Sequence, residues 1–178
     1  MVYTHLHNDH AGNCHLFPNS RHIFQRADWL HLIDPLPVEK FRGDFDLQAI
    51  TELQKMECHT VEGNFQLAPG IMCYQTPGHT QGSMILAVET SKGLSVITGD
   101  TCLFKCNLYP QSDKIKQIDG TMLKITPQQK ELGPAIQPVL CSNQWEWLRS
   151  IRLIHTICKN EDFVLTGHDP SQVGLVIK

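Results

Sequence analysis

The segment His5-Leu6-His7-Asn8-Asp9-His10 places four metal-ligand side chains within six positions of the chain. Where a strand turns into a loop, His5 and His7 project to the same side. Asp9 and His10 follow around the bend and can face a second centre nearby. Imidazole nitrogen with carboxylate oxygen suits Zn²⁺, Fe²⁺ or Mn²⁺, and without a thiolate in the motif zinc is the default. The alternative is a histidine-rich surface turn.

Three later runs of apolar or β-branched residues end at a glycine or proline break, which is typical of strands that run into turns. These runs are residues 71–76, 94–98 and 163–166. His79, Asp100 and His168 follow directly after the breaks. Loops at the rim of a sheet often carry functional side chains, so we expect these residues to converge with the first motif. This context favours a metal site over a surface turn.

Composition limits the function classes that the chain can belong to. Its 178 residues, 41% hydrophobic and 19% charged, predict one globular domain. The formal charge is −3 without a basic stripe, so nucleic acid is not an expected partner. No apolar run approaches the ~20 residues of a membrane span, so no membrane partner is expected. The seven cysteines include no C-x-x-C pair, which predicts free thiols and a cytoplasmic location.

The pattern between the motifs predicts a mixed α/β fold. Residues 21–25 and 84–88 read as strands, and 45–56 and 143–159 read as helices with apolar residues on one face. Residues 105–141 show no clear period and contain four prolines. A long irregular segment in a compact domain is usually functional or mobile.

The start of that irregular segment supplies side chains that could face a substrate. The candidates, chosen because long loops often line sites, are Phe104, Leu108 and Tyr109. Other histidines and tryptophans are expected to be surface or core residues without a role in catalysis. These are His15, His22, His31, His59, His155, Trp145 and Trp147.

The motifs together resemble the metallo-β-lactamase superfamily of binuclear metal hydrolases. The resemblance rests on the first motif, residues 76–80, 99–100 and 167–168, and it spans residues 2–169. It implies an αββα sandwich with two divalent metals, zinc or else iron or manganese, at one rim. It also implies the ligands: His5, His7 and His79 for the first metal, Asp9, His10 and His168 for the second, and Asp100 as the bridge.

Within the superfamily, residues 5–13, 23–28 and 167–169 are most similar to the quorum-quenching N-acyl-homoserine lactone lactonases. This similarity implies a hydrolase that opens a lactone, or a related ester, by metal-bound hydroxide. Asp9 would then shuttle a proton beside the bridging Asp100. The lactonases carry a tyrosine three residues after the bridging aspartate, where it contacts the substrate carbonyl. Leu103 stands there in this chain, so we expect weak activity.

Other branches of the superfamily fit less well. Class B3 β-lactamases share the pattern of residues 77–83 but lack a bridging aspartate. Glyoxalase II thioesterases have the aspartate but add a C-terminal helical domain. The nucleases usually add RNA-gripping modules. A β-lactamase-like hydrolase, a glyoxalase II-like thioesterase and a metal-binding fragment without activity remain as alternatives.

Only four residues precede His5, too few for the strand on which such motifs usually sit. We therefore expect residues 1–178 to form a single metallo-β-lactamase-like domain that lacks part of its N-terminal half. An exposed apolar sheet face would then favour homo-oligomers or dependence on a partner. The expected ligand is a small-molecule substrate.

Overall fold

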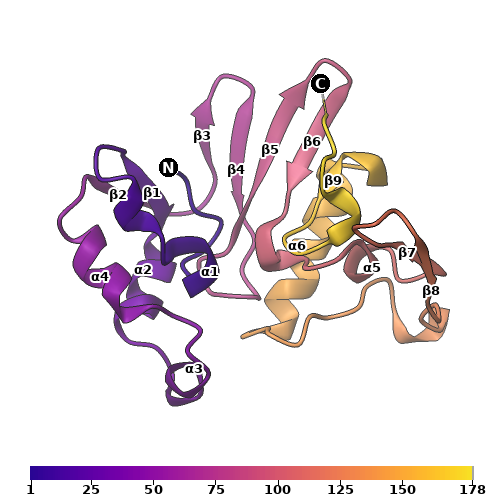
Figure 1. The fold of residues 1–178 in the computed structure, drawn as a ribbon, viewed down its shortest axis with the longest axis horizontal. Helices are drawn as coiled ribbons and strands as arrows, with labels where there is room; N and C mark the ends of the chain where they lie inside the picture. Colours follow the sequence, from indigo (N-terminus) through magenta and orange to yellow (C-terminus); the bar gives the residue numbers. More distant parts are fainter. Residues whose placement is uncertain (178) are drawn as a thin grey trace.

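The structure, a computed structural model, describes residues 1–177 and contains two main sheets with helices packed against them (Figure 1). The larger sheet has the strand order β3-β4-β5-β6-β9 and is antiparallel except for the parallel pair β6-β9. Its strands are β3 (Phe65–Ala68), β4 (Ile71–Gln75), β5 (Met84–Thr90), β6 (Gly93–Ile97) and β9 (Val164–Leu165).

The smaller sheet lies beside the start of the chain. Strands β1 (His22–Gln25) and β2 (Cys58–Val61) pair in parallel, and Val2 makes one parallel bridge to Ile23. The segment that carries the first histidines therefore leaves from the edge of this sheet. A separate antiparallel hairpin is formed by β7 (Lys114–Lys116) and β8 (Met122–Lys124).

The described residues form six α-helices joined by loops and short 3₁₀ turns. The helices are α1 (Asn8–Ala11), α2 (Arg26–Ile33), α3 (Pro37–Arg42), α4 (Leu47–Leu53), α5 (Lys105–Leu108) and α6 (Gln144–Ile157). Within residues 1–177, no helix has the length and apolar character needed to cross a membrane.

Each sheet has its own apolar core. Trp147, Ile151 and Ile154 of α6 pack against Ile85 and Val96 of the larger sheet. Helices α2 and α4 cover the smaller sheet in the same way. That second core contains Tyr3, Leu6, Phe24, Leu32, Ala49 and Leu53. Two sheets, each backed by helices, give the layers expected of an αββα sandwich.

Most predicted elements are present, and the differences have local causes. The helix predicted over 143–159 is α6, and the strand predicted over 84–88 lies within β5. The helix predicted over 45–56 is shorter, as α4. The segment 105–141, predicted to be irregular, contains α5 and the β7-β8 hairpin. These elements are only three or four residues long and therefore leave no detectable period.

The two tryptophans of α6 have different environments. Trp147 is buried, as predicted, and its indole Nε1 donates a 2.7 Å hydrogen bond to the carbonyl of Thr101. Trp145 is 78% exposed instead. Residues two positions apart on a helix do not share a face, so only one of the pair can pack inward.

Gly78 lets the turn after β4 pass directly against α6. Its φ is +140°, and a Cβ atom there would lie 2.5 Å from the Cα of Trp147. Only glycine fits this close approach without displacing the helix or the turn. The next residue is His79, so this contact also fixes where that side chain begins.

Replacing Gly78 by alanine should lower the free energy of unfolding by roughly 2–4 kcal/mol, because backbone strain and overpacking add. Gly93 is a matched control: its φ is +128°, but a Cβ atom there would have no neighbour within 4 Å. Gly93→Ala should therefore cost only the strain, roughly 1–2 kcal/mol. Urea unfolding of both variants measures the difference, and equal losses would contradict the packing argument.

Candidate metal centre

Three buried histidines form the first cluster of ligand atoms. Nε2 of His79 lies 3.2 Å from Nε2 of His5 and 3.0 Å from Nδ1 of His7. The three side chains are buried, and one ligand nitrogen from each lies within 4.8 Å of the other two. Three lone-pair-bearing nitrogens that point at one another suit a shared cation.

Burial also favours the protonation state that a metal needs. Desolvation lowers the pKa of all three histidines, and it lowers that of His7 to about 3. The rings are therefore neutral at pH 7. A neutral imidazole is the form that binds a metal ion.

The second cluster consists of Asp9, His10, Asp100 and His168, whose ligand atoms also lie within 4.8 Å of one another. Nε2 of His10 is 3.3 Å from Oδ1 of Asp100, and Nε2 of His168 is 3.1 Å from Oδ2 of Asp100. The carboxylate of Asp9 is 3.4 Å from Nε2 of His168.

Asp100 lies between the two clusters. Its Oδ2 is 3.7 Å from Nε2 of His79 and 3.9 Å from Nε2 of His5, in addition to its contacts with the second cluster. Burial alone would raise the pKa of Asp100, but the nearby histidines, His10 first, outweigh burial and lower it. The group is therefore a carboxylate at neutral pH.

Two buried polar atoms show that a metal ion would fit the second cluster. Among the described residues, Nε2 of His10 and Oδ1 of Asp100 are buried polar atoms without a hydrogen-bond partner. Leaving such atoms unpaired is costly, and bound ions are one way in which proteins satisfy them. The structure thus places all seven predicted residues in two adjoining clusters suited to two divalent metal ions.

The local backbone explains how the residues of the second cluster converge. His10 lies in α1, Asp100 lies in the 3₁₀ turn after β6, and His168 follows β9. Gly167 has to be glycine, because a Cβ atom there would lie 2.4 Å from Oδ1 of Asp100. Parallel pairing of β6 with β9 brings the ends of these two strands together.

Asp28 is a supporting residue that the sequence analysis missed. It is fully buried, and its carboxylate accepts hydrogen bonds from the backbone N–H groups of Leu6 (2.6 Å) and Gly82 (3.0 Å). Leu6 lies between two ligand histidines, and Gly82 closes the turn that carries His79. Nothing in the local pattern of α2 distinguishes Asp28 from a solvent-facing helix residue.

The irregular segment before α6 orients one of the clustered histidines. Nδ1 of His79 donates a 2.7 Å hydrogen bond to the carbonyl of Leu140. This bond fixes the ring and leaves Nε2 to face the cluster, as the hydrogen bonds made by the other nitrogen of metal-binding histidines do.

An open cavity of about 440 Å³ lies beside the clusters. Asp9, Asp100 and His168 line it, together with Leu103 and Phe104. Phe104 thus lies where a substrate-facing role was predicted. Leu103 occupies the wall beside Asp100 and provides no hydroxyl group.

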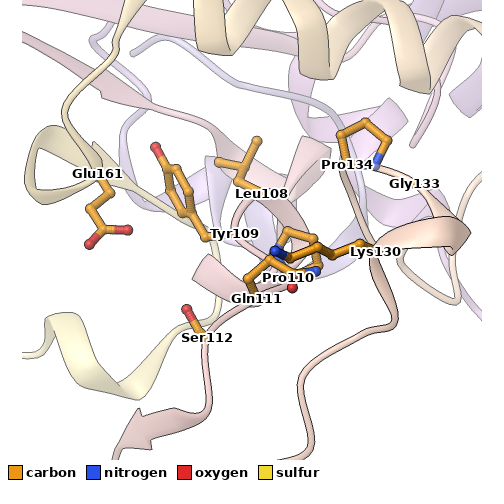
Figure 2. Close-up of a pocket in the computed structure, with 9 residues that line it drawn as sticks. All are labelled: Leu108, Tyr109, Pro110, Gln111, Ser112, Lys130, Gly133, Pro134 and Glu161. Carbon is orange, nitrogen blue, oxygen red and sulfur yellow. The ribbon is translucent and has the colours of Figure 1, made fainter.

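Leu108 and Tyr109 lie elsewhere, which corrects the prediction that they accompany Phe104. They line a separate pocket of about 730 Å³ with Pro110, Pro134 and Glu161 (Figure 2). Helix α5 turns the chain inward, so Leu108 packs in the core of the larger sheet. Among the residues that the structure describes, the buried Tyr109 hydroxyl has no hydrogen-bond partner, and Tyr109 does not line the cavity beside the clusters.

The remaining histidines and the cysteines lie outside the clusters. His22 is buried between the Tyr3 hydroxyl and the Phe17 carbonyl, and His31 pairs with Glu39 at 2.8 Å. The cysteines are all free thiols, as predicted: Cys14, Cys58, Cys73, Cys102, Cys106, Cys141 and Cys158.

Relatives of known activity share much of this sequence. No family profile matches the chain. An N-acyl homoserine lactonase from Bacillus cereus is 32% identical over 108 residues, which are 60% of this chain and 40% of that protein. The N-acyl homoserine lactonase AttM from Rhizobium radiobacter is 27% identical over 184 residues, covering 96% of this chain and 57% of that protein. The chain spans about half the length of these curated relatives.

Solved structures match over almost the whole chain. An N-acyl homoserine lactone hydrolase with N-hexanoyl-L-homoserine at its catalytic metal centre gives a TM-score of 0.68 at 25% identity, covering 97% of this chain and 56% of that one. A Bacillus thuringiensis AiiA mutant with N-decanoyl-L-homoserine bound matches with the same scores. The resemblance to lactonases of the metallo-β-lactamase fold is confirmed in sequence and in fold.

Protein prepared with an excess of divalent metal should hold two metal equivalents per chain, measured by plasma emission. Asp100→Ala should lose chiefly one of them, because it removes the carboxylate between the clusters and leaves the histidines. Asp113 is an exposed carboxylate outside the clusters, and Asp113→Ala should retain both equivalents. Metal-free protein from a metal-replete preparation would contradict the site.

Because Tyr109 is partly buried, we expect the free energy of unfolding to fall at high pH. Burial raises the pKa of Tyr109 to about 12, whereas a phenol in the unfolded chain titrates near ~10. Between those values the folded state holds more protons than the unfolded state, so the free energy of unfolding falls as pH rises. Tyr109→Phe should flatten this slope in urea unfolding between about pH 10 and 12. Equal slopes for the two proteins would contradict the assignment.

Proposed function

We propose that this chain carries the metal centre of a binuclear hydrolase that opens lactones of the N-acyl-homoserine type. The observation behind the proposal is the convergence of seven ligand-type residues on two adjoining clusters that share Asp100. The lactonase relatives add support, since their sequences and fold match this chain.

In this proposal the first cluster would hold one metal ion and the second cluster another, and Asp100 would serve both because it lies between the clusters. Zinc is the expected metal, because neutral imidazoles and carboxylates without thiolates form its usual catalytic sites. When bound, the two ions lower the pKa of water toward neutrality and polarise a carbonyl group. The side chains of Asp9 and Asp100 would supply carboxylate oxygens that offset part of their positive charge.

Asp9 is placed to move a proton during hydrolysis. Its carboxylate is about half exposed and lines the cavity, 3.4 Å from His168. Water adds to the lactone carbonyl carbon, and the ring C–O bond then breaks. An oxygen of the Asp9 carboxylate would take the proton from the water and return it to the leaving ring oxygen, which becomes a hydroxyl group.

With Leu103 at this position, we expect slow turnover. A tyrosine hydroxyl at this place would donate a hydrogen bond to the substrate carbonyl, and Leu103 cannot do so. Loss of one such donor costs roughly 10²–10³ in kcat where it has been measured. Tyr109, the nearest tyrosine in sequence, lines another pocket and does not replace it.

One alternative is a metal-binding protein without activity. It is supported by the fraction of the relatives' length that the chain covers. Because it spans only 40% and 57% of two lactonases, it could bind metal without turning over substrate.

We also propose that the protein is cytoplasmic, because its seven thiols are free. Association between copies is supported by β3, which within residues 1–177 pairs only with β4 and leaves the other edge of the larger sheet open.

The metal-loaded protein should hydrolyse acyl-homoserine lactones faster than simple esters, a glutathione thioester or nitrocefin, measured as kcat/KM. Asp100→Ala should abolish turnover, whereas Asp113→Ala should leave it unchanged. Fastest turnover of nitrocefin would support a β-lactamase instead. Two bound metals without turnover of any substrate in the panel would support the inactive metal-binding protein.

A further inference from the structure

The segment of residues 105–130 carries an excess of positive charge. It contains two aspartates, no arginine and no glutamate, against five lysines: Lys105, Lys114, Lys116, Lys124 and Lys130. Within residues 1–177 none of these lysines makes an ion pair, whereas four arginines and Lys55 elsewhere in the chain do. Asp119, one of the two aspartates, is bonded to the backbone N–H and the hydroxyl of Thr121. The charge of the lysines is therefore largely uncompensated.

The pairing of β7 with β8 places two of these lysines directly opposite each other. Lys114 is the cross-strand partner of Lys124, and Lys116 lies two residues further along β7 on the same face as Lys114. Like charges directly opposite in a sheet destabilise the pairing. Figure 1 shows this hairpin at the outer side of the molecule, beside α5 and remote from the smaller sheet. An anion bound against this face would offset the repulsion.

A pocket of about 200 Å³ lies against the same face of the hairpin. Lys114 and Lys116 line it from β7, Lys105 lines it from the start of α5, and Ser112 and Ser171 add hydroxyl groups. Ammonium and hydroxyl groups donate hydrogen bonds, and charged donors bind phosphate oxygens well. Pockets for drug-sized ligands measure roughly 300–1,000 Å³, so this pocket suits a small anion.

Two carboxylates also line the pocket, and they are fewer than its three ammonium groups. Asp169 accepts the backbone N–H groups of Lys105 and Ser171, each at 2.9 Å, so both of its oxygens are bonded to the main chain. Glu161 is exposed and makes no ion pair within the part of the chain that the structure describes. Lys124, opposite Lys114, adds a further positive charge nearby. The electrostatic potential of the pocket therefore favours an anion, and Glu161 is the group that opposes it.

We propose that this pocket, between β7, the start of α5 and Ser171, binds the phosphate group of a small molecule, either inorganic phosphate or a phosphate monoester. A phosphate group carries a charge of about −1.5 to −2 at neutral pH and has several acceptor oxygens, which match the three ammonium groups. The pocket shares no lining residue with the cavity beside the clusters. The inference therefore does not depend on the proposed function.

Amide NMR on the metal-loaded full chain tests the site residue by residue. Inorganic phosphate and glycerol phosphate are titrated separately, each against chloride at the same ionic strength. The signals of Lys114, Lys116 and Ser171 should shift along one saturating curve, and the tighter of the two ligands identifies the free ion or the ester as the preferred form. Equal shifts in chloride would indicate salt screening alone and would overturn the inference. Shifts confined to residues of the metal-ligand clusters would also overturn it.

Lys114→Gln should raise the Kd for phosphate about ten-fold, because it removes one charged donor. Lys92 is the matched control: it is an exposed lysine in the turn between β5 and β6 and does not line the pocket, so Lys92→Gln should leave Kd unchanged. Glu161→Gln should lower Kd, because it removes the opposing carboxylate. Equal effects of the two lysine variants would contradict the site.

Lys124→Glu separates binding from hairpin stability. It places a carboxylate opposite Lys114, so it should raise the free energy of unfolding and also weaken phosphate binding. A gain in stability with an unchanged Kd would mean that the lysines only affect the hairpin, and the inference would fail.

Discussion

The buried carboxylate of Asp28 joins the two backbone segments on which the first histidine cluster depends. One oxygen accepts the N–H of Leu6 and the other accepts the N–H of Gly82. Burying a carboxylate without hydrogen-bond partners costs free energy. The two bonds therefore stabilise the fold most when the segments that contain Leu6 and Gly82 are both in place. His5 and His7 flank one of them, and His79 lies three residues before the other. The spacing of the three imidazoles therefore depends on a side chain that does not line the cavity beside the clusters.

The larger sheet and α6 supply a second constraint on the same turn. Trp147 packs over Gly78 and bonds to the carbonyl of Thr101, the residue after Asp100. One helix residue thus contacts both the turn that carries His79 and the turn that carries Asp100. Metal ions bound by ligands from separate strand ends would add to this connection, because the unfolded chain offers no preformed site and binding energy becomes folding energy.

The sequence predicted the clusters well because ligand-type residues after strand-like runs are a local pattern. It could not predict Asp28, whose partners Leu6 and Gly82 are distant in sequence and are brought to it only by the fold. The placement of Leu108 and Tyr109 failed for a related reason. A four-residue helix, too short to leave a period, turns them away from the cavity and buries Leu108. Periodic elements and the convergence of the ligand-type residues were predictable, whereas the packing contacts of Asp28 and Leu108 were not.

The segment before α6 contacts the first histidine cluster through its main chain and lines a neighbouring groove with its side chains. The carbonyl of Leu140 orients His79, while the side chains of Val139 and Leu140 line the groove. Any residue at position 140 supplies a carbonyl, so side chains here can change without removing the bond to the imidazole. The main chain can thus preserve the orientation of His79 while the neighbouring side chains change. The lining of the groove and the geometry of the first cluster are therefore separable in this part of the fold, although both involve Leu140.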